Sequence, residues 1–124
     1  MSRKTLGLSA CLAGVLLMPI PLAAHHGGTT LYDLQKEVTM KVVITEYVWA
    51  NPHVWIGFDA RDEKGVAHRW LLEDSSPPVL VNRGMSRKSL KAGDAVTITF
   101  NPGRKGYIGR TVKIVMADGK TFTR

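Results

Sequence analysis

The side chains of this 124-residue chain that could do chemistry are mainly its four histidines. His25 and His26 are adjacent and follow an apolar run that ends in small residues, where a signal peptidase could cut. Cleavage after Ala24 would let the new amino group and the imidazole of His25 chelate one metal ion. Cleavage after Ala23 would make His26 the third residue of the mature chain. Its imidazole, together with the new amino group and two backbone nitrogens, could then form a square-planar site. Both donor sets suit Cu(II) or Ni(II). A copper site at these histidines is therefore one interpretation, and incidental metal binding by a disordered tail, with no dedicated cofactor, is the other.

His53 is the third candidate metal ligand, and it lies in the string W-A-N-P-H-V-W at residues 49–55. Strand alternation places His53 on the same face as Trp55. The hairpin register argued below puts Glu73 opposite Trp55, one diagonal step from His53. A carboxylate at that position would orient the imidazole and raise its basicity. The alternative is that His53 only begins a strand after the Pro52 corner.

The first 24 residues have the pattern of a cleavable signal peptide. A basic Arg3-Lys4 pair precedes an apolar stretch, Leu6–Leu22, that is interrupted by prolines and is too short for a comfortable membrane span. We therefore expect export to the periplasm and no transmembrane segment in the mature chain. Cys11 follows a lipoprotein-like box, but that box would cut the apolar stretch in half, so lipidation is not expected.

Composition limits the mature chain to one small domain. Loss of Arg3 and Lys4 leaves 15 basic against 10 acidic side chains, a formal charge of +5. The only cysteine leaves with the signal peptide, so packing and backbone pairing must stabilise the domain without a disulfide. We expect a monomer.

The rest of the sequence alternates with period two and is divided by turn residues, which predicts β-strands. The apolar face changes sides near Glu46, which predicts a bend or bulge in the first strand. The Asp62–Gly65 turn pairs residue 62 with residue 66 and therefore places Asp59 opposite Arg69. The expected elements are strands at Val38–Trp49, His53–Ala60 and Val66–Glu73, a short helix within Ser76–Gly84, a strand carrying Val96, Ile98 and Phe100, a strand Tyr107–Met116 with Ile108, Val112, Ile114 and Met116 on one side, and a terminal ribbon at Thr121–Thr123.

This order predicts an all-β fold, a small OB-like barrel of five to six strands with one short helix between strands 3 and 4. A sandwich is the alternative, because strand order alone does not show which strands close the sheet. The expected organisation is a signal peptide at 1–24, a flexible histidine-containing segment at 25–36 and the barrel at 37–124.

Several motifs together resemble a family of small exported bacterial proteins of unknown function. They are W-x-N-P-H-V-W at 49–55, the D-E-x-G turn, W-x-L-E at 70–73, G-M-S-R-K-S-L-K-A-G-D at 84–94 and the closing A-D-G-K. Members also tend to begin with two adjacent histidines after the signal. The resemblance covers nearly the whole mature chain and implies export and a small β domain, but it supplies no activity.

Two surface groups could bind a partner. Exposed aromatic side chains on the face of a barrel indicate a binding surface. The alternative is that these side chains only close the ends of a small barrel. The expected binding face comprises Trp49, Trp55, Arg69 and Glu73. The basic groups suit an anionic envelope surface better than nucleic acid, because an exported protein meets little nucleic acid; they comprise Arg83, Arg87, Lys88, Lys91, Arg104 and Lys105. A metal-free adaptor that holds an envelope protein or an anionic glycan is therefore the alternative to copper binding.

Catalysis finds little support in the sequence, and we expect a binding module rather than an enzyme. The chain has no nucleophile elbow, no H-E-x-x-H and no phosphate-binding glycine loop. Glu73 and Asp74 are adjacent carboxylates, but neighbouring residues at a strand end point to opposite faces and would not share one substrate.

Overall fold

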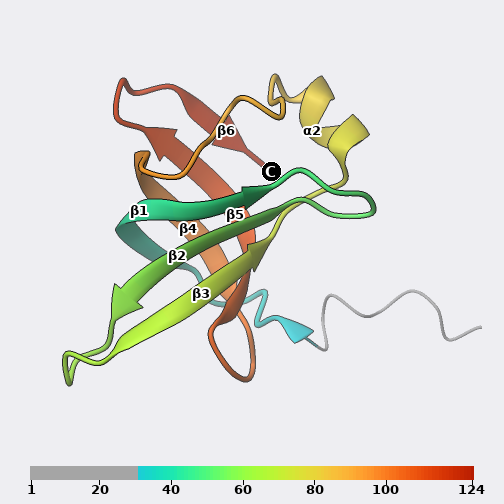
Figure 1. The fold of residues 1–124 in the computed structure, drawn as a ribbon. Coiled ribbons are helices and arrows are strands. Elements are labelled where there is room, and N and C mark those ends of the chain that lie inside the picture. Colours follow the sequence, from blue (N-terminus) through green and yellow to red (C-terminus); the bar gives the residue numbers. More distant parts are fainter. Residues whose placement is uncertain (1–30) are drawn as a thin grey trace, which may run out of the picture.

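The computed structural model describes residues 31–124, in which six strands and one short helix form a barrel (Figure 1). The segment 1–24, expected to be a signal peptide, and with it Cys11, lies outside the described residues, as do His25 and His26. Within the described part of the chain, no helix is long and apolar enough to cross a membrane. The elements are β1 (Val38–Val48), β2 (Trp55–Arg61), β3 (Ala67–Glu73), α2 (Pro77–Asn82), β4 (Ala95–Pro102), β5 (Ile108–Met116) and β6 (Thr121–Thr123).

The sheet closes on itself. Its strand order is β3-β2-β1-β4-β5-β6, and β3 also pairs with β5 in parallel, with Leu71 beside Ile108. Strands β1, β2, β3, β5 and β4 therefore form a closed ring, β6 extends the sheet beyond β5, and α2 lies between β3 and β4 in sequence. This is the expected OB-like barrel, and the closure excludes the open sandwich.

Strand β1 serves two partners because it changes direction at a bulge. Its first half pairs with β4 from Val38 to Val43, and its second half pairs with β2. The register shifts between Ile44 and Glu46, which confirms the bend expected from the change of apolar face. Gly57 lies opposite this bulge, where an added Cβ would be 3.1 Å from the Cβ of Glu46.

The β2–β3 hairpin has the register expected from its turn. Phe58 pairs with Trp70, and Trp55 with Glu73. Asp59 and Arg69 are also paired, and their side chains form an ion pair of 2.7 Å. The two-residue repeat of a strand explains this agreement, because a slip by one residue would turn every apolar side chain toward water.

The interior of the barrel holds one hydrophobic core. Trp70 stacks on Phe58 with ring centroids 6.3 Å apart, and Phe100 contacts both rings. Helix α2 covers one end of the barrel with Leu80, which is 1% exposed. The fully buried side chains are Phe58, Phe100, Ile44, Ile56, Leu72, Leu80, Ile98, Ile114 and Val54.

Strand β5 departs from the simple alternation. Thr99 pairs with Lys113, whereas Phe100 pairs with Thr111, so β5 carries one extra residue at this point. The bulge reverses the parity of the first half of the strand. Thr111 therefore faces the core and is 2% exposed, while Ile108, which the sequence placed on the same side as Ile114, contacts Gly103 on the opposite face.

The folded domain begins before residue 37. Tyr32 is 3% exposed and forms a β-bridge with Gly103, and the backbone N–H of Asp33 donates to the carbonyl of Pro102. The segment 31–36, which was expected to belong to a flexible tail, is thus in contact with the end of β4. The reason is a buried aromatic side chain whose partners lie far away in the sequence.

Candidate functional site

A histidine, a glutamate and a tyrosine form the most chemically distinctive group in the described chain. The Nδ1 atom of His53 lies 2.5 Å from Oε1 of Glu73. The hydroxyl of Tyr32 donates to the other carboxylate oxygen, also at 2.5 Å. One carboxylate therefore holds two side chains that are distant in the sequence.

Local backbone structure fixes the two ends of this contact. Glu73 is the last residue of β3 and pairs with Trp55, the first residue of β2. Beyond that pair the ladder continues irregularly, because the N–H of Asp74 donates to the carbonyl of Val54. Val54 is fully buried, so its neighbour His53 is held at the surface beside the carboxylate.

The arrangement leaves one nitrogen of His53 free for a ligand. When Nδ1–H donates to Glu73, the Nε2 atom carries the lone pair. The His53 side chain is 45% exposed, whereas that of Glu73 is 17% exposed. Metal-binding imidazoles usually have this orientation, in which the nitrogen that does not bind the metal donates a hydrogen bond to a carboxylate.

Tyr32 is a hydrogen-bond donor to this group and stays protonated. Burial raises the pKa of the Tyr32 phenol well above its ordinary value, and the hydrogen bond to Glu73 and its negative charge raise it further. Arg110 and Arg124 lower it by a smaller amount. The phenol therefore remains neutral at any physiological pH and fixes residue 32 to the end of β3.

His68, the other histidine of the barrel, is already engaged. Its Nε2 atom lies 2.8 Å from Oδ2 of Asp62 and 3.1 Å from the hydroxyl of Tyr107. Its ring stacks on that of Tyr107, with centroids 3.9 Å apart. The hydrogen bond to His68 lowers the pKa of Asp62. This group closes the far end of the hairpin and is separate from His53.

The four residues expected to form a binding face do not all lie together. Trp55, Glu73 and Arg69 share one face of the hairpin, as their pairing implies. Arg69 is bound by Asp59 and is also 3.6 Å from Glu46. Trp49 instead packs against the core and contacts the ring of Tyr47 edge-on.

The expected basic residues divide into two groups. Those after α2 make local contacts: Arg83 donates to Ser75 Oγ at 3.2 Å, and Lys91 pairs with Asp94 at 2.6 Å. Arg104 and Lys105 lie on the exposed β4–β5 loop. The side chains of Arg87 and Lys88 are also exposed.

Three buried polar residues were not among the site residues expected from the sequence. Tyr32 contacts a carboxylate 41 positions away, which no local pattern indicates. Asp74 is 3% exposed and Thr111 is 2% exposed. For Asp74 a weak signal existed, since a residue next to an outward Glu73 at a strand end must point inward.

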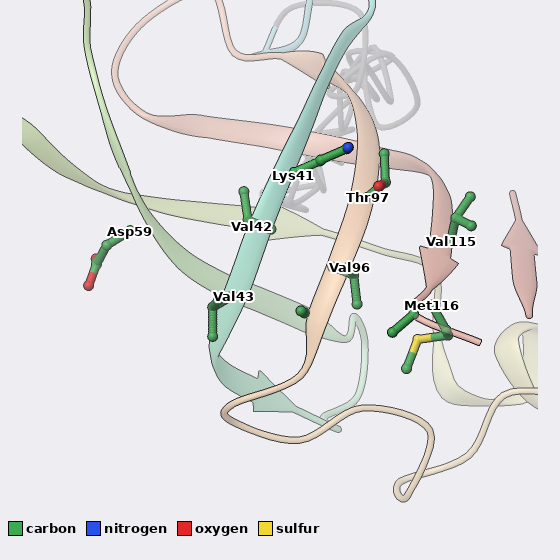
Figure 2. A pocket seen from close by; sticks show the side chains of 10 residues that line it. Lys41, Val42, Val43, Asp59, Val96, Thr97, Val115 and Met116 are labelled. Carbon is green, nitrogen blue, oxygen red and sulfur yellow. The ribbon is translucent and has the colours of Figure 1, made fainter. Parts of the chain in front are cut away.

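A separate concavity of about 570 Å³ is lined mainly by residues of β1, β4 and β5, with Asp59 of β2 (Figure 2). Its walls are mostly small or aliphatic, such as Val43, Thr97 and Val115, and Lys41 and Asp59 are its only charged residues. None of the site residues expected from the sequence lines it.

Within residues 31–124, no group of three or more His, Cys, Asp or Glu side chains could hold a metal ion. No curated protein and no solved structure matches the chain. A family described as being of unknown function, DUF6152, matches residues 14–112, most of the chain, and the protein belongs to this family.

Proposed function

We propose that the protein is an exported, non-catalytic binding module of the bacterial envelope that takes up Cu(II) through His25, His26 and His53. The observation that carries the proposal is the contact between His53 Nδ1 and Glu73, which leaves Nε2 at the surface as a nitrogen donor. One imidazole is too little for a strong site, so the adjacent histidines of the tail supply the remaining donors.

Chain reach allows these donors to meet. Tyr32 is held against the same carboxylate that contacts His53. His26 lies six residues before Tyr32, and six extended residues span about 20 Å at most. Fixing Tyr32 to Glu73 therefore keeps the tail histidines close to His53 and raises their effective concentration there.

The alternative is a metal-free adaptor that holds an envelope protein or an anionic glycan. Trp55 on the hairpin face and the exposed Arg87 and Lys88 favour it. The two functions differ in what they need from the histidines. Copper binding depends on His25 and His26, whereas an adaptor that uses its aromatic face and basic loops is indifferent to them.

Copper titration of the correctly processed protein tests the proposal. Mass spectrometry of the exported form first establishes the cleavage position, and competition against a chelator of known affinity then gives the dissociation constant for Cu(II). We expect a sub-micromolar site that is lost in a variant with His25 and His26 both replaced by Ala. His53→Ala and Glu73→Gln should each weaken binding, the latter by about 10–100-fold, as loss of a carboxylate behind a histidine ligand does.

His68→Ala is the matched control, because His68 is engaged by Asp62 and Tyr107. Its copper affinity should equal that of the wild type. Millimolar binding, or binding unchanged when both tail histidines are absent, would overturn the copper proposal and favour the adaptor. Loss in the tail variant together with full affinity in His53→Ala would place the copper in the tail alone.

A further inference from the structure

Three arginines gather at the end of the barrel covered by α2. The charges of Arg83, Arg110 and Arg124 all act on the buried carboxyl group of Asp74. Yet among the described residues none of the three forms an ion pair; the Arg83 guanidinium donates only to Ser75 Oγ, at 3.2 Å. Three guanidiniums with unmet hydrogen-bonding capacity form a site for negative charge.

A small cavity of about 10 Å³ is lined by two of these arginines, Arg83 and Arg124. Its polar walls are Asp74, Arg83, Thr111, Thr123 and Arg124, and its remaining walls are largely apolar. A space of this size holds one water-sized atom. It can therefore admit a single oxygen of a larger group but not a whole phosphate.

Thr111 supplies the second, independent indication of a ligand. Its Oγ1 atom is buried and has no hydrogen-bond partner, although it lines the cavity. An unpaired buried hydroxyl costs about 1–3 kcal/mol, so in a native fold it needs an explanation. The β5 bulge places this hydroxyl in the core beside the arginines.

The charges select an anion over a cation. The charged groups near the cavity are two carboxyl groups, of Asp74 and Glu73, and three guanidiniums, of Arg83, Arg110 and Arg124. Glu73 is already held by two other side chains. The guanidiniums only donate hydrogen bonds, and an anion accepts them.

We propose that this cavity binds a carboxylate or phosphate group. One oxygen enters the cavity and accepts a hydrogen bond from Thr111 Oγ1, while the remaining oxygens lie at the mouth between the guanidiniums of Arg83 and Arg124. Small anions and the acidic groups of envelope glycans and lipids share this chemistry. The site shares no side chain with the proposed copper site.

Asp74 makes the binding depend on pH. Burial raises its pKa, and the backbone N–H of Ser75 and the arginines only partly offset this effect. A protonated Asp74 no longer repels an anion and can donate a hydrogen bond to it. The charged groups that act on Asp74 are Arg83, Arg110 and Arg124. The phenol of Tyr47, whose pKa is also raised by burial, stays neutral at pH 4–8, and Glu73 is the other carboxyl group to control.

Calorimetric titration of the metal-free protein with inorganic phosphate and, separately, with acetate tests the site, at constant ionic strength to exclude general screening. Loss of a hydrogen bond to a charged group corresponds to about 10–100-fold in affinity. Arg83→Gln and Thr111→Val should therefore weaken binding at least tenfold. Asp74→Asn should tighten binding of acetate at pH 7. It should also remove the pH dependence that is left after correction for the ionisation of acetate itself, and Glu73→Gln should leave that dependence in place.

Arg87→Gln is the matched control, since Arg87 lies on the same loop but does not line the cavity. If Arg87→Gln weakens binding as much as Arg83→Gln, the attraction is generic and the proposal is overturned. The proposal is also overturned if Thr111→Val binds the anions like the wild type while thermal unfolding shows that the variant is folded. A third refuting result is that neither anion saturates the protein below about 10 mM, which corresponds to a binding free energy near 3 kcal/mol. Tighter binding of phosphate than of acetate by the wild type would assign the ligand to phosphate-bearing molecules, and the reverse order to carboxylates.

Discussion

Replacing Tyr32 with Phe removes one hydroxyl and nothing else, so it measures how strongly the segment before β1 is held. The lost interaction is a hydrogen bond of 2.5 Å from a phenol to the Glu73 carboxylate. A hydrogen bond to a charged group contributes about 1.5–3 kcal/mol. The Glu73 side chain is 17% exposed, so water can partly replace the donor, and we expect the free energy of unfolding to fall by about 1.5 kcal/mol.

Urea denaturation followed by tryptophan fluorescence gives this free energy, and thermal unfolding gives an independent check. For a domain of this size, 1 kcal/mol corresponds to roughly 4–8 °C in Tm. Tyr107→Phe is the matched control, because its hydroxyl makes a longer, exposed hydrogen bond of 3.1 Å to His68. That variant should lose no more than about 0.5 kcal/mol.

A double-mutant cycle with Glu73→Gln separates the pair from its surroundings. If Tyr32 and Glu73 act on each other as the structure indicates, the two changes together should cost less than the sum of the single changes, by about 1 kcal/mol. Additive losses, or a loss for Tyr32→Phe no larger than that for Tyr107→Phe, would refute the reasoning. The tail would then not be fixed at Glu73, and the argument that brings its histidines to His53 would fail with it.

Three further changes test other parts of the structure. Thr111→Val should raise the free energy of unfolding by about 1 kcal/mol, measured by urea denaturation without anions, because it removes an unpaired buried hydroxyl. Because the pKa of Asp74 is raised, its own contribution to stability decreases as pH rises from the unfolded value of 3.8 through the folded value. Asp74→Asn should therefore be more stable than the wild type at pH 7, and thermal unfolding should show this difference vanish toward pH 3. Gly109→Ala should cost at least about 1–3 kcal/mol, since its Cβ would lie 2.6 Å from Phe100 and 2.7 Å from Leu72, whereas chemical denaturation should find Gly57→Ala much milder.

The hairpin is the part of the fold that the sequence predicts most completely. Its turn, its strand alternation and its charge pairing all require the same register, so Asp59 meets Arg69 and Trp55 meets Glu73. The proximity of His53 and Glu73 follows from that register and was also predicted. Agreement between independent local signals made this part predictable.

The missed features share a different cause, which is dependence on distant residues. The β5 bulge inserts one residue opposite β4 and reverses the parity that would have placed Ile108 in the core. Its apolar pattern carries no mark of that insertion. Likewise, Tyr32 gave no periodic signal, and its burial depends on Gly103 and Glu73, which only barrel closure brings to it.

The adjacent carboxylates at the end of β3 link the two proposed sites. Glu73 faces outward, to His53 and Tyr32, whereas Asp74 faces the cavity with the arginines. Because strand alternation turns the two side chains to opposite faces, they do not share one substrate. The two proposed sites nevertheless lie on opposite faces of the same pair of adjacent residues. Arg110 and Arg124 act electrostatically on both Tyr32 and Asp74. A ligand that changes the charge at one face therefore changes the field at the other, and any coupling between copper and anion affinity must be equal in both directions.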